Sequence, residues 1–223
     1  MKEIFKEALN WYEQVKPKEA MRHRTTQLEN LIDSIGGFEF DKVVCIETGA
    51  SKDFIADGAV GVFFAKACEL SGGEFHSVDI EESTVHKSME MYAGLGLEEG
   101  NHYVGDSVEF LKQTDVVPNL VHLDSWDVNL KDPLPCALHG WREFEAIEGK
   151  MPKGSVLIVD DNWFKGTWVE WITNGQSEKI TIDYPILGKG ALVWHYVNQG
   201  SSNWVKINED QVGANVKIIY KKI

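Results

Sequence analysis

Residues 43–49 read VVCIETG, and they introduce the pattern that most of the chain follows. A short apolar run such as 43–46 is typical of a strand that is buried on both faces of a parallel sheet. A helical stretch at 59–70 comes next and is closed by Gly72-Gly73. The sequence here therefore predicts a buried strand followed by a helix.

The same unit repeats along the chain. Four further apolar runs have the length of strands, at 75–80, 102–104, 120–123 and 155–159. Helical stretches alternate with these runs, at 82–95, 107–112 and 134–148. Strands that alternate with helices indicate βαβ units and a parallel sheet.

The two ends depart from this repeat. Apolar residues spaced three and four apart predict an N-terminal helical extension over 1–37. Near the other end, a helix at 191–197 precedes two apolar runs, 204–207 and 216–220, that are typical of an antiparallel hairpin. We expect one α/β domain over 1–223, with a mostly parallel seven-stranded sheet, helices on both faces and a C-terminal antiparallel hairpin.

Composition narrows the classes of partner. Hydrophobic residues make up 43% of the chain, so general disorder is excluded. The net charge is −13, and a field of that sign repels phosphate backbones and anionic membranes. We therefore expect neither nucleic acid nor a membrane as a partner.

The first residues, the length of the apolar runs and the cysteines all bear on where the protein is located. The first residues are charged and contain no apolar core of a signal peptide, and no apolar run approaches the ~20 residues that span a bilayer. Cys45, Cys68 and Cys136 show no metal-type spacing, and the first two lie in apolar runs. We expect a cytoplasmic protein.

Acidic residues mark the carboxyl ends of the five expected strands. The strand ends carry or are soon followed by Glu47, Asp79, Asp106, Asp124 and Asp160. Any one of them could simply cap a helix or order a turn. In sheets of this kind, however, ligands bind outside the carboxyl ends of the strands, so five acids in order indicate a ligand site.

From Val43 to about Trp163 the chain resembles the class I S-adenosylmethionine (SAM)-dependent methyltransferases, which implies a Rossmann-like fold. The resemblance implies that Glu47-Thr48-Gly49 form the acid-and-glycine loop beside the methionine part of SAM. It implies that Asp79, in FHSVDI, accepts both ribose hydroxyls, since a carboxylate offers paired acceptors. Gly105-Asp106-Ser107 match the adenine corner, and Asp124 completes the expected cofactor set.

The first loop differs from the usual glycine loop. Residues 51–57 intervene before the next glycine, Gly58, and we expect this insertion to act as a lid. Asp57 and Gly58 are candidates for contact with the methionine part of SAM. A nicotinamide Rossmann protein is the nearest competitor, but it requires G-x-G-x-x-G where this chain has ETGASKDF. SAM has a positive sulfonium and no phosphate, so an acidic loop suits it better.

A finer resemblance involves LDSWD at 123–127 and VLIVDDNW at 156–163, which are similar to the metal-dependent O-methyltransferases of the catechol, caffeoyl-CoA and macrocin types. It implies a Mg²⁺ ion held by Asp124, Asp161 and Asn162, with Asp160 as a substitute. All are hard oxygen ligands, as Mg²⁺ prefers. The alternative is that Asp160 and Asp161 only order a turn.

The sequence offers more than one candidate for the residue that accepts the proton of the acceptor hydroxyl. The catechol type has a lysine where this chain has Asp127, so Asp127 and His139 are candidates, beside Asp124 as a catalytic metal ligand. A lone histidine on a helix is more often a packed or surface residue, and His122 is expected in the core. Aromatic residues crowd 163–171 and suit either an acceptor pocket or a homodimer contact.

The expected function is methyl transfer from SAM to a hydroxyl of a small-molecule acceptor, assisted by Mg²⁺. Two alternatives stay open. One is a metal-independent N- or O-methyltransferase, and the other is a catalytically silent SAM-fold binding protein. A nicotinamide-dependent oxidoreductase is the weakest alternative.

Overall fold

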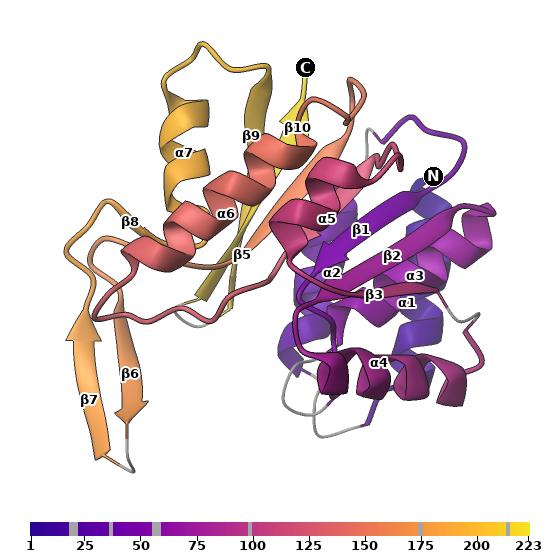
Figure 1. Cartoon of the computed structure of the whole chain (residues 1–223), viewed down its shortest axis with the longest axis horizontal. Helices are drawn as coiled ribbons and strands as arrows, with labels where there is room; N and C mark the ends of the chain where they lie inside the picture. The colour runs from indigo at the N-terminus through magenta and orange to yellow at the C-terminus, as the bar shows by residue number, and fades with distance from the viewer. Residues whose placement is uncertain (18–21, 36–37, 55–58, 98–99, 174–175, 213–214) are drawn as a thin grey trace.

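The computed structural model describes residues 1–17, 22–35, 38–54, 59–97, 100–173, 176–212 and 215–223. The central sheet has the order β3-β2-β1-β4-β5-β10-β9, with β8 also paired to β5. Its parallel half contains β1 (Val44–Thr48), β2 (Glu74–Asp79), β3 (Asn101–Val104), β4 (Leu120–Leu123) and β5 (Val156–Phe164). The expected Rossmann-like α/β architecture is confirmed (Figure 1).

The C-terminal strands form the expected antiparallel pair. They are β9 (Trp204–Val212) and β10 (Asn215–Lys222), both longer than the apolar runs suggested. β10 lies between β5 and β9 and is antiparallel to both. The second half of the sheet is therefore mixed in direction.

Helices cover both faces of the sheet. One face is covered by α1 (Lys2–Val15), α2 (Arg22–Ser34), α3 (Val60–Ser71) and α4 (Glu82–Gly94), and the other by α5 (Ser107–Gln113), α6 (Leu134–Ile147) and α7 (Ala191–Asn198). The neighbours Cys45 and Ile46 belong to the hydrophobic clusters on opposite faces, as a doubly buried strand requires. Among the described residues, no helix is both long enough and apolar enough to cross a bilayer.

The end of β5 differs from the sequence expectation. We expected the fifth strand over 155–159 with Asp160, Asp161 and Asn162 in the loop after it. Pairing with β4 does stop at Val159, but β5 continues to Phe164 by pairing antiparallel with β8 (Ile186–Gly188). The three polar residues therefore lie within a strand, and Asn162 is paired on both sides, with Val216 of β10 and Gly188 of β8.

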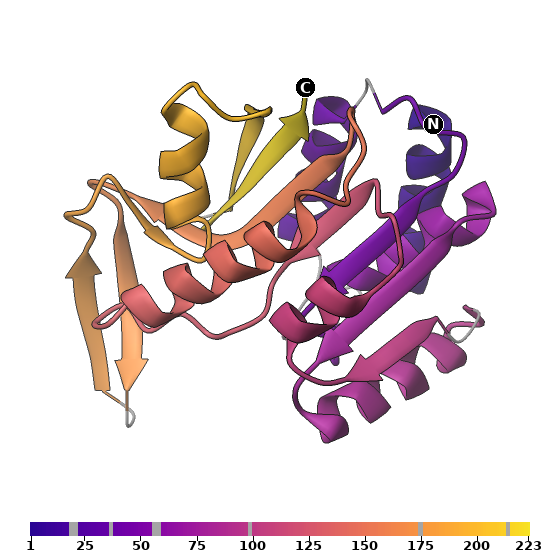
Figure 2. The same ribbon diagram turned by 45° about the horizontal axis from the view of Figure 1, so that its top comes forward.

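A second hairpin was missed altogether. It consists of β6 (Trp168–Thr173) and β7 (Gln176–Thr181), and it projects from the body of the molecule (Figures 1 and 2). The sequence does contain a signal, because Asn174-Gly175 separates two runs rich in β-forming residues. We expected the aromatic residues here to border an acceptor pocket or to form a homodimer contact.

Strand order reverses between β1 and β4, and this positions the site. Successive strands run outward from β1 to β3, and the chain then returns to pair β4 with the other edge of β1. Loops after β1 and β4 therefore lead away from each other, and the crevice between them is where ligands of such sheets bind.

Gly49 is required at this reversal. Its φ is +82°, and a Cβ atom would lie 2.5 Å from the backbone oxygen of Asp124. A left-handed conformation alone costs a non-glycine residue about 1–2 kcal/mol. We predict that Gly49→Ala lowers the free energy of unfolding by more than this, measured by urea denaturation, because the loops after β1 and β4 must also move apart.

Gly96 offers a matched control. Its φ is +68°, but a Cβ atom there would have no neighbour within 4 Å. Gly96→Ala should therefore cost only the conformational part, about 1–2 kcal/mol. Equal losses for the two variants would contradict the role given to the close approach at Gly49.

Candidate cofactor and acceptor site

A cavity of about 430 Å³ opens at the carboxyl ends of β1, β2, β4 and β5. It therefore occupies the crevice that the reversal of strand order predicts. Its wall brings together the following expected site residues: Gly49, Asp79, Asp106, Ser107, Asp124, Asp127, His139, Asp160 and Asp161. The wall also includes Lys52, Glu81, Ser125, Trp126 and Lys189, which the sequence analysis did not assign.

Glu47 does not line this cavity. Its side chain is 1% exposed, and a Cβ atom on Gly61 in α3 would lie 2.3 Å from Oε2. Its Oε1 lies 3.2 Å from Nδ1 of buried His122. The carboxylate therefore faces α3 and His122, and it does not line the cavity at which we expected it to contact the cofactor.

Other cofactor candidates have different outcomes. Thr48 is fully buried and is also absent from the cavity wall, so of the triplet Glu47-Thr48-Gly49 only Gly49 reaches the cavity. Asp57 and Gly58 lie outside the described residues, as does part of the expected lid. Ser51 is buried and Lys52 is exposed at its start.

Asp79 is held rigidly at the cavity. Its Oδ2 accepts a hydrogen bond from Ala50 N at 3.0 Å, and its Oδ1 accepts one from Glu81 N at 2.8 Å. Each carboxylate oxygen has a second lone pair. The side chain can thus accept two more hydrogen bonds at the cavity wall.

Asp106 caps a helix, which is the structural role that the sequence analysis left open for these acids. Its Oδ1 accepts a hydrogen bond from Glu109 N at 3.0 Å and so caps α5. The residue is nevertheless exposed and lines the cavity. Capping therefore orients a carboxylate that also borders the site.

The most important residue that the sequence analysis missed is Lys189. Its Nζ lies 2.6 Å from Asp124 Oδ1, 2.9 Å from the backbone oxygen of Asp124 and 2.9 Å from Asp161 Oδ2. Lys189 lies between Gly188, the last residue of β8, and Gly190, the N-cap of α7. No spacing rule connects this segment with acids 28 and 65 residues earlier.

Asp124 and Lys189 hold each other in charged form. Burial has the largest single effect and would raise the pKa of Asp124, but the charges of Lys189, His122 and Lys217 and the hydrogen bond from Lys189 together lower this pKa to about 2. Burial would lower the pKa of Lys189, but Asp124 and Asp161 raise it above its usual value. Lys189, Asp124 and Asp161 thus form an ion triad in which the ammonium is buried and both carboxylates are partly exposed at the cavity, and Asp124 is a poor proton acceptor.

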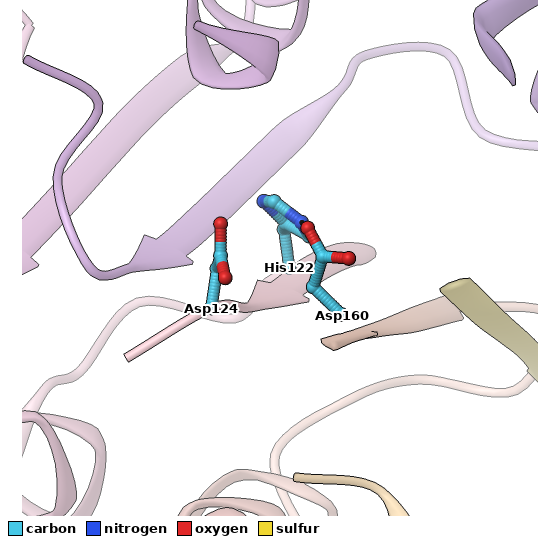
Figure 3. Close-up of side chains that lie close together, drawn as sticks. All are labelled: His122, Asp124 and Asp160. Carbon is cyan, nitrogen blue, oxygen red and sulfur yellow. Dashed lines mark ion pairs between the residues drawn. The ribbon is translucent and has the colours of Figure 1, made fainter. Parts of the chain in front are cut away.

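A second lysine, Lys217, is paired with Asp160. The Nζ of Lys217, in β10, forms an ion pair with Asp160 Oδ2. His122 Nε2 lies 3.8 Å from the same oxygen, and Figure 3 shows the two side chains close together beside Asp124. Polar groups of β1, β4, β5 and β10 thus form a buried chain, Glu47–His122–Asp160–Lys217. His122 is buried as expected, but among charged neighbours.

Asn162 does not fit its expected role as a metal ligand. It is fully buried, and its Nδ2 donates to the backbone oxygens of Val159, Asp160 and Val216. Its Oδ1 accepts from Gly190 N at 2.7 Å. The side-chain amide is therefore committed to holding β5, β10 and the start of α7 together.

The residues present do not fit the expected Mg²⁺ site. Lys189 lies between Asp124 and Asp161, Lys217 neutralises Asp160, and Asn162 is occupied by backbone groups. Within the described part of the chain, His122, Asp124 and Asp160 do bring ligand atoms within 4.8 Å of one another (Figure 3). Asp124 and Asp160 of this set are each already paired with an ammonium, so an ion there would have to displace a lysine.

His139 lies on the cavity wall within a polar network. Its Nε2 is 3.0 Å from Ser107 Oγ and 3.5 Å from Glu143 Oε1, and its ring packs on Trp126 with centroids 5.0 Å apart. Glu143 is 1% exposed and accepts a hydrogen bond from Ser125 Oγ at 2.6 Å. His139 is therefore neither a core residue nor a free surface residue.

The sequence contained a signal for Glu143. His139 and Glu143 are four residues apart on one expected helix, a spacing that places them on the same face. Asp127, the other candidate proton acceptor, is exposed on the cavity wall.

The chain matches no known protein-family profile and no curated protein. Solved structures do match. An O-methyltransferase from Bacillus cereus in complex with S-adenosylhomocysteine has a TM-score of 0.56 and 13% identity, over 99% of this chain and 91% of that one. An rRNA methylase from Streptococcus thermophilus has a TM-score of 0.51 and 11% identity, over 86% and 93%.

TrmN from Thermus thermophilus matches with a TM-score of 0.53 and 10% identity over 81% of this chain. The chain spans only 44% of the length of TrmN. A SAM-dependent methyltransferase from Clostridium acetobutylicum is among the other matches. At these identities the likeness concerns the fold, and the fold of this chain is that of the SAM-dependent methyltransferases.

Proposed function

We propose that this chain is a SAM-dependent methyltransferase that acts on a hydroxyl group of a small molecule. The observation that carries the proposal is the cavity at the β1–β4 reversal, where Asp79 is held with two acceptor positions toward the site. The likeness to an O-methyltransferase that binds S-adenosylhomocysteine supports the choice of cofactor. The triad at Lys189 favours the metal-independent form of this activity.

The charge of the cavity also supports SAM. Two lysines line the cavity, Lys52 and Lys189, and Lys189 is already paired with two carboxylates. The acidic residues on the wall number seven: Asp79, Glu81, Asp106, Asp124, Asp127, Asp160 and Asp161. An excess of carboxylates attracts a sulfonium cation and repels the pyrophosphate of a nicotinamide cofactor.

The acceptor is proposed to be small and to carry no polyanion. Some proteins of the same fold are rRNA methylases, so the fold itself permits a nucleic-acid substrate. Here the net charge of −13 and the acidic cavity oppose the approach of a phosphate backbone. Exposed Trp126, which lines the cavity beside His139, offers apolar surface for the body of a small molecule.

The residues divide the chemistry between them. When bound, SAM supplies an electrophilic methyl group that is transferred by in-line displacement. Asp79 orients the ribose, and Gly49 lets the backbone lie close to the cavity. His139 takes the proton of the acceptor hydroxyl, while Glu143 and Ser107 orient its ring. Asp127 is the second candidate acceptor of that proton.

Asp79→Ala tests the cofactor site. The substitution removes both acceptor positions, so SAM affinity measured by calorimetry should fall by ~1.5–3 kcal/mol, the range for hydrogen bonds to a charged group. Asp115→Ala, at an exposed acid outside the cavity wall, should leave affinity unchanged. Circular dichroism melts would establish that both variants are folded. Unaltered SAM affinity in Asp79→Ala would rule out this assignment.

His139→Asn tests the proton acceptor. Release of S-adenosylhomocysteine would be followed with a panel of phenols, catechols and sugar alcohols, with ribosomal RNA and transfer RNA as separate arms. With whichever hydroxyl compound is turned over, kcat should fall ~10²–10⁴-fold, as for loss of a general base, while SAM affinity stays the same. The exposed His195→Asn serves as the control. Turnover of RNA alone would overturn the proposed acceptor class.

A further inference from the structure

The ion triad at Lys189 is built into the fold and does not depend on a flexible surface side chain. Lys189 is 3% exposed, and its backbone N–H donates to Asp161 O. Its neighbour Gly188 has a φ of +126°, and a Cβ atom there would lie 2.0 Å from Asp161 O. A Cβ atom on Gly140 in α6 would lie 2.4 Å from the backbone oxygen of Lys189. The lysine backbone is thus enclosed closely between β5 and α6.

The ammonium group uses its full hydrogen-bonding capacity. An ammonium has three N–H donors, and Nζ of Lys189 has three oxygen partners within 2.9 Å, two on Asp124 and one on Asp161. No donor remains to activate an acceptor molecule. The role of Lys189 is therefore to join the end of β4 to the outer part of β5 at the cavity wall.

These three oxygens are also of the type that a divalent cation selects. Two carboxylates and a backbone carbonyl are hard oxygen ligands, and Mg²⁺ and Mn²⁺ complete their coordination with water. The lysine occupies the point at which these oxygens converge. The position that the sequence assigned to a metal ion is thus filled by a cation of the chain itself.

We propose that Lys189 is a tethered replacement for a divalent cation, and that it holds Asp124 and Asp161 in place so that the cavity wall forms without metal. Lys189 is a positioning residue, because it acts through the two acids. The inference deepens the proposed methyltransferase function, but it concerns the protein without SAM or acceptor and can be tested separately.

Lys189→Ala provides the decisive test. The substitution removes the ammonium, leaves two carboxylates facing each other and opens space where the side chain was. Mn²⁺ would be titrated into chelator-treated full-length protein without SAM, and bound Mn²⁺ measured by electron paramagnetic resonance. We expect the variant to bind Mn²⁺ at least tenfold more tightly than the native chain, and Mn²⁺ to raise its Tm. A merely structural role of Lys189 would produce no gain of metal affinity.

Three matched variants locate the effect. Lys52→Ala removes the same charge from the same cavity but from an exposed residue, and should gain no Mn²⁺ affinity. Lys189→Arg keeps a positive charge at this position, so its Mn²⁺ affinity should be as low as that of the native chain. In the double variant Lys189→Ala/Asp161→Asn, one ligand is lost and the gain should disappear.

The native chain gives a result even where Lys189→Ala fails to fold. We expect its Tm and its SAM affinity to be unchanged by excess chelator or by Mn²⁺. Tight Mn²⁺ binding by the native chain that Asp161→Asn abolishes would overturn the proposal, as would a folded Lys189→Ala variant with no gain. Failure of the methyltransferase proposal would show instead as absence of SAM binding in every variant, with or without metal.

Discussion

Repulsion between carboxylates is the constraint that this site must satisfy. The strand order brings the ends of β2, β4 and β5 to one cavity, and acids stand at each of them. Carboxylates a few ångströms apart cannot all remain ionised without compensating groups. The structure compensates these acids in three ways. Backbone N–H groups donate to Asp79, and Lys189 pairs with both Asp124 and Asp161. Lys217 pairs with Asp160, beside His122.

The compensating groups also explain the irregular second half of the sheet. Lys217 comes from β10 at the point where its register with β5 shifts, and Lys189 comes from the junction of β8 and α7. Asn162 joins these parts, since its amide binds the backbone of Val216 and of Gly190. The antiparallel strands thus bring cations to acids that stand on parallel strands.

Local pattern was enough to predict the regular part of the molecule. Apolar runs and their alternation with helices predicted the parallel half of the sheet and the terminal antiparallel pair, and acids at the strand ends predicted the place of the cavity. Pairing partners were not predictable in the same way. The extension of β5 depends on β8, which is three residues long, and nothing in 156–164 indicates that such a partner exists. Glu47 likewise follows the expected motif, yet its direction is decided by Gly61 and His122.

The metal expectation shows why a cluster of acids is ambiguous in sequence. An acid motif specifies where negative charge gathers, but several cations can neutralise it: a divalent ion, a lysine, or a charged ligand. The choice between them depends on whether a lysine from elsewhere in the chain reaches the same point. Here Lys189 reaches Asp124 and Asp161 because Gly188 has a positive φ and Gly140 packs closely on the lysine backbone. Tertiary contacts determine both features. A glycine on each side of Lys189 was visible in the sequence, and its meaning appears only once β5 and α6 enclose it.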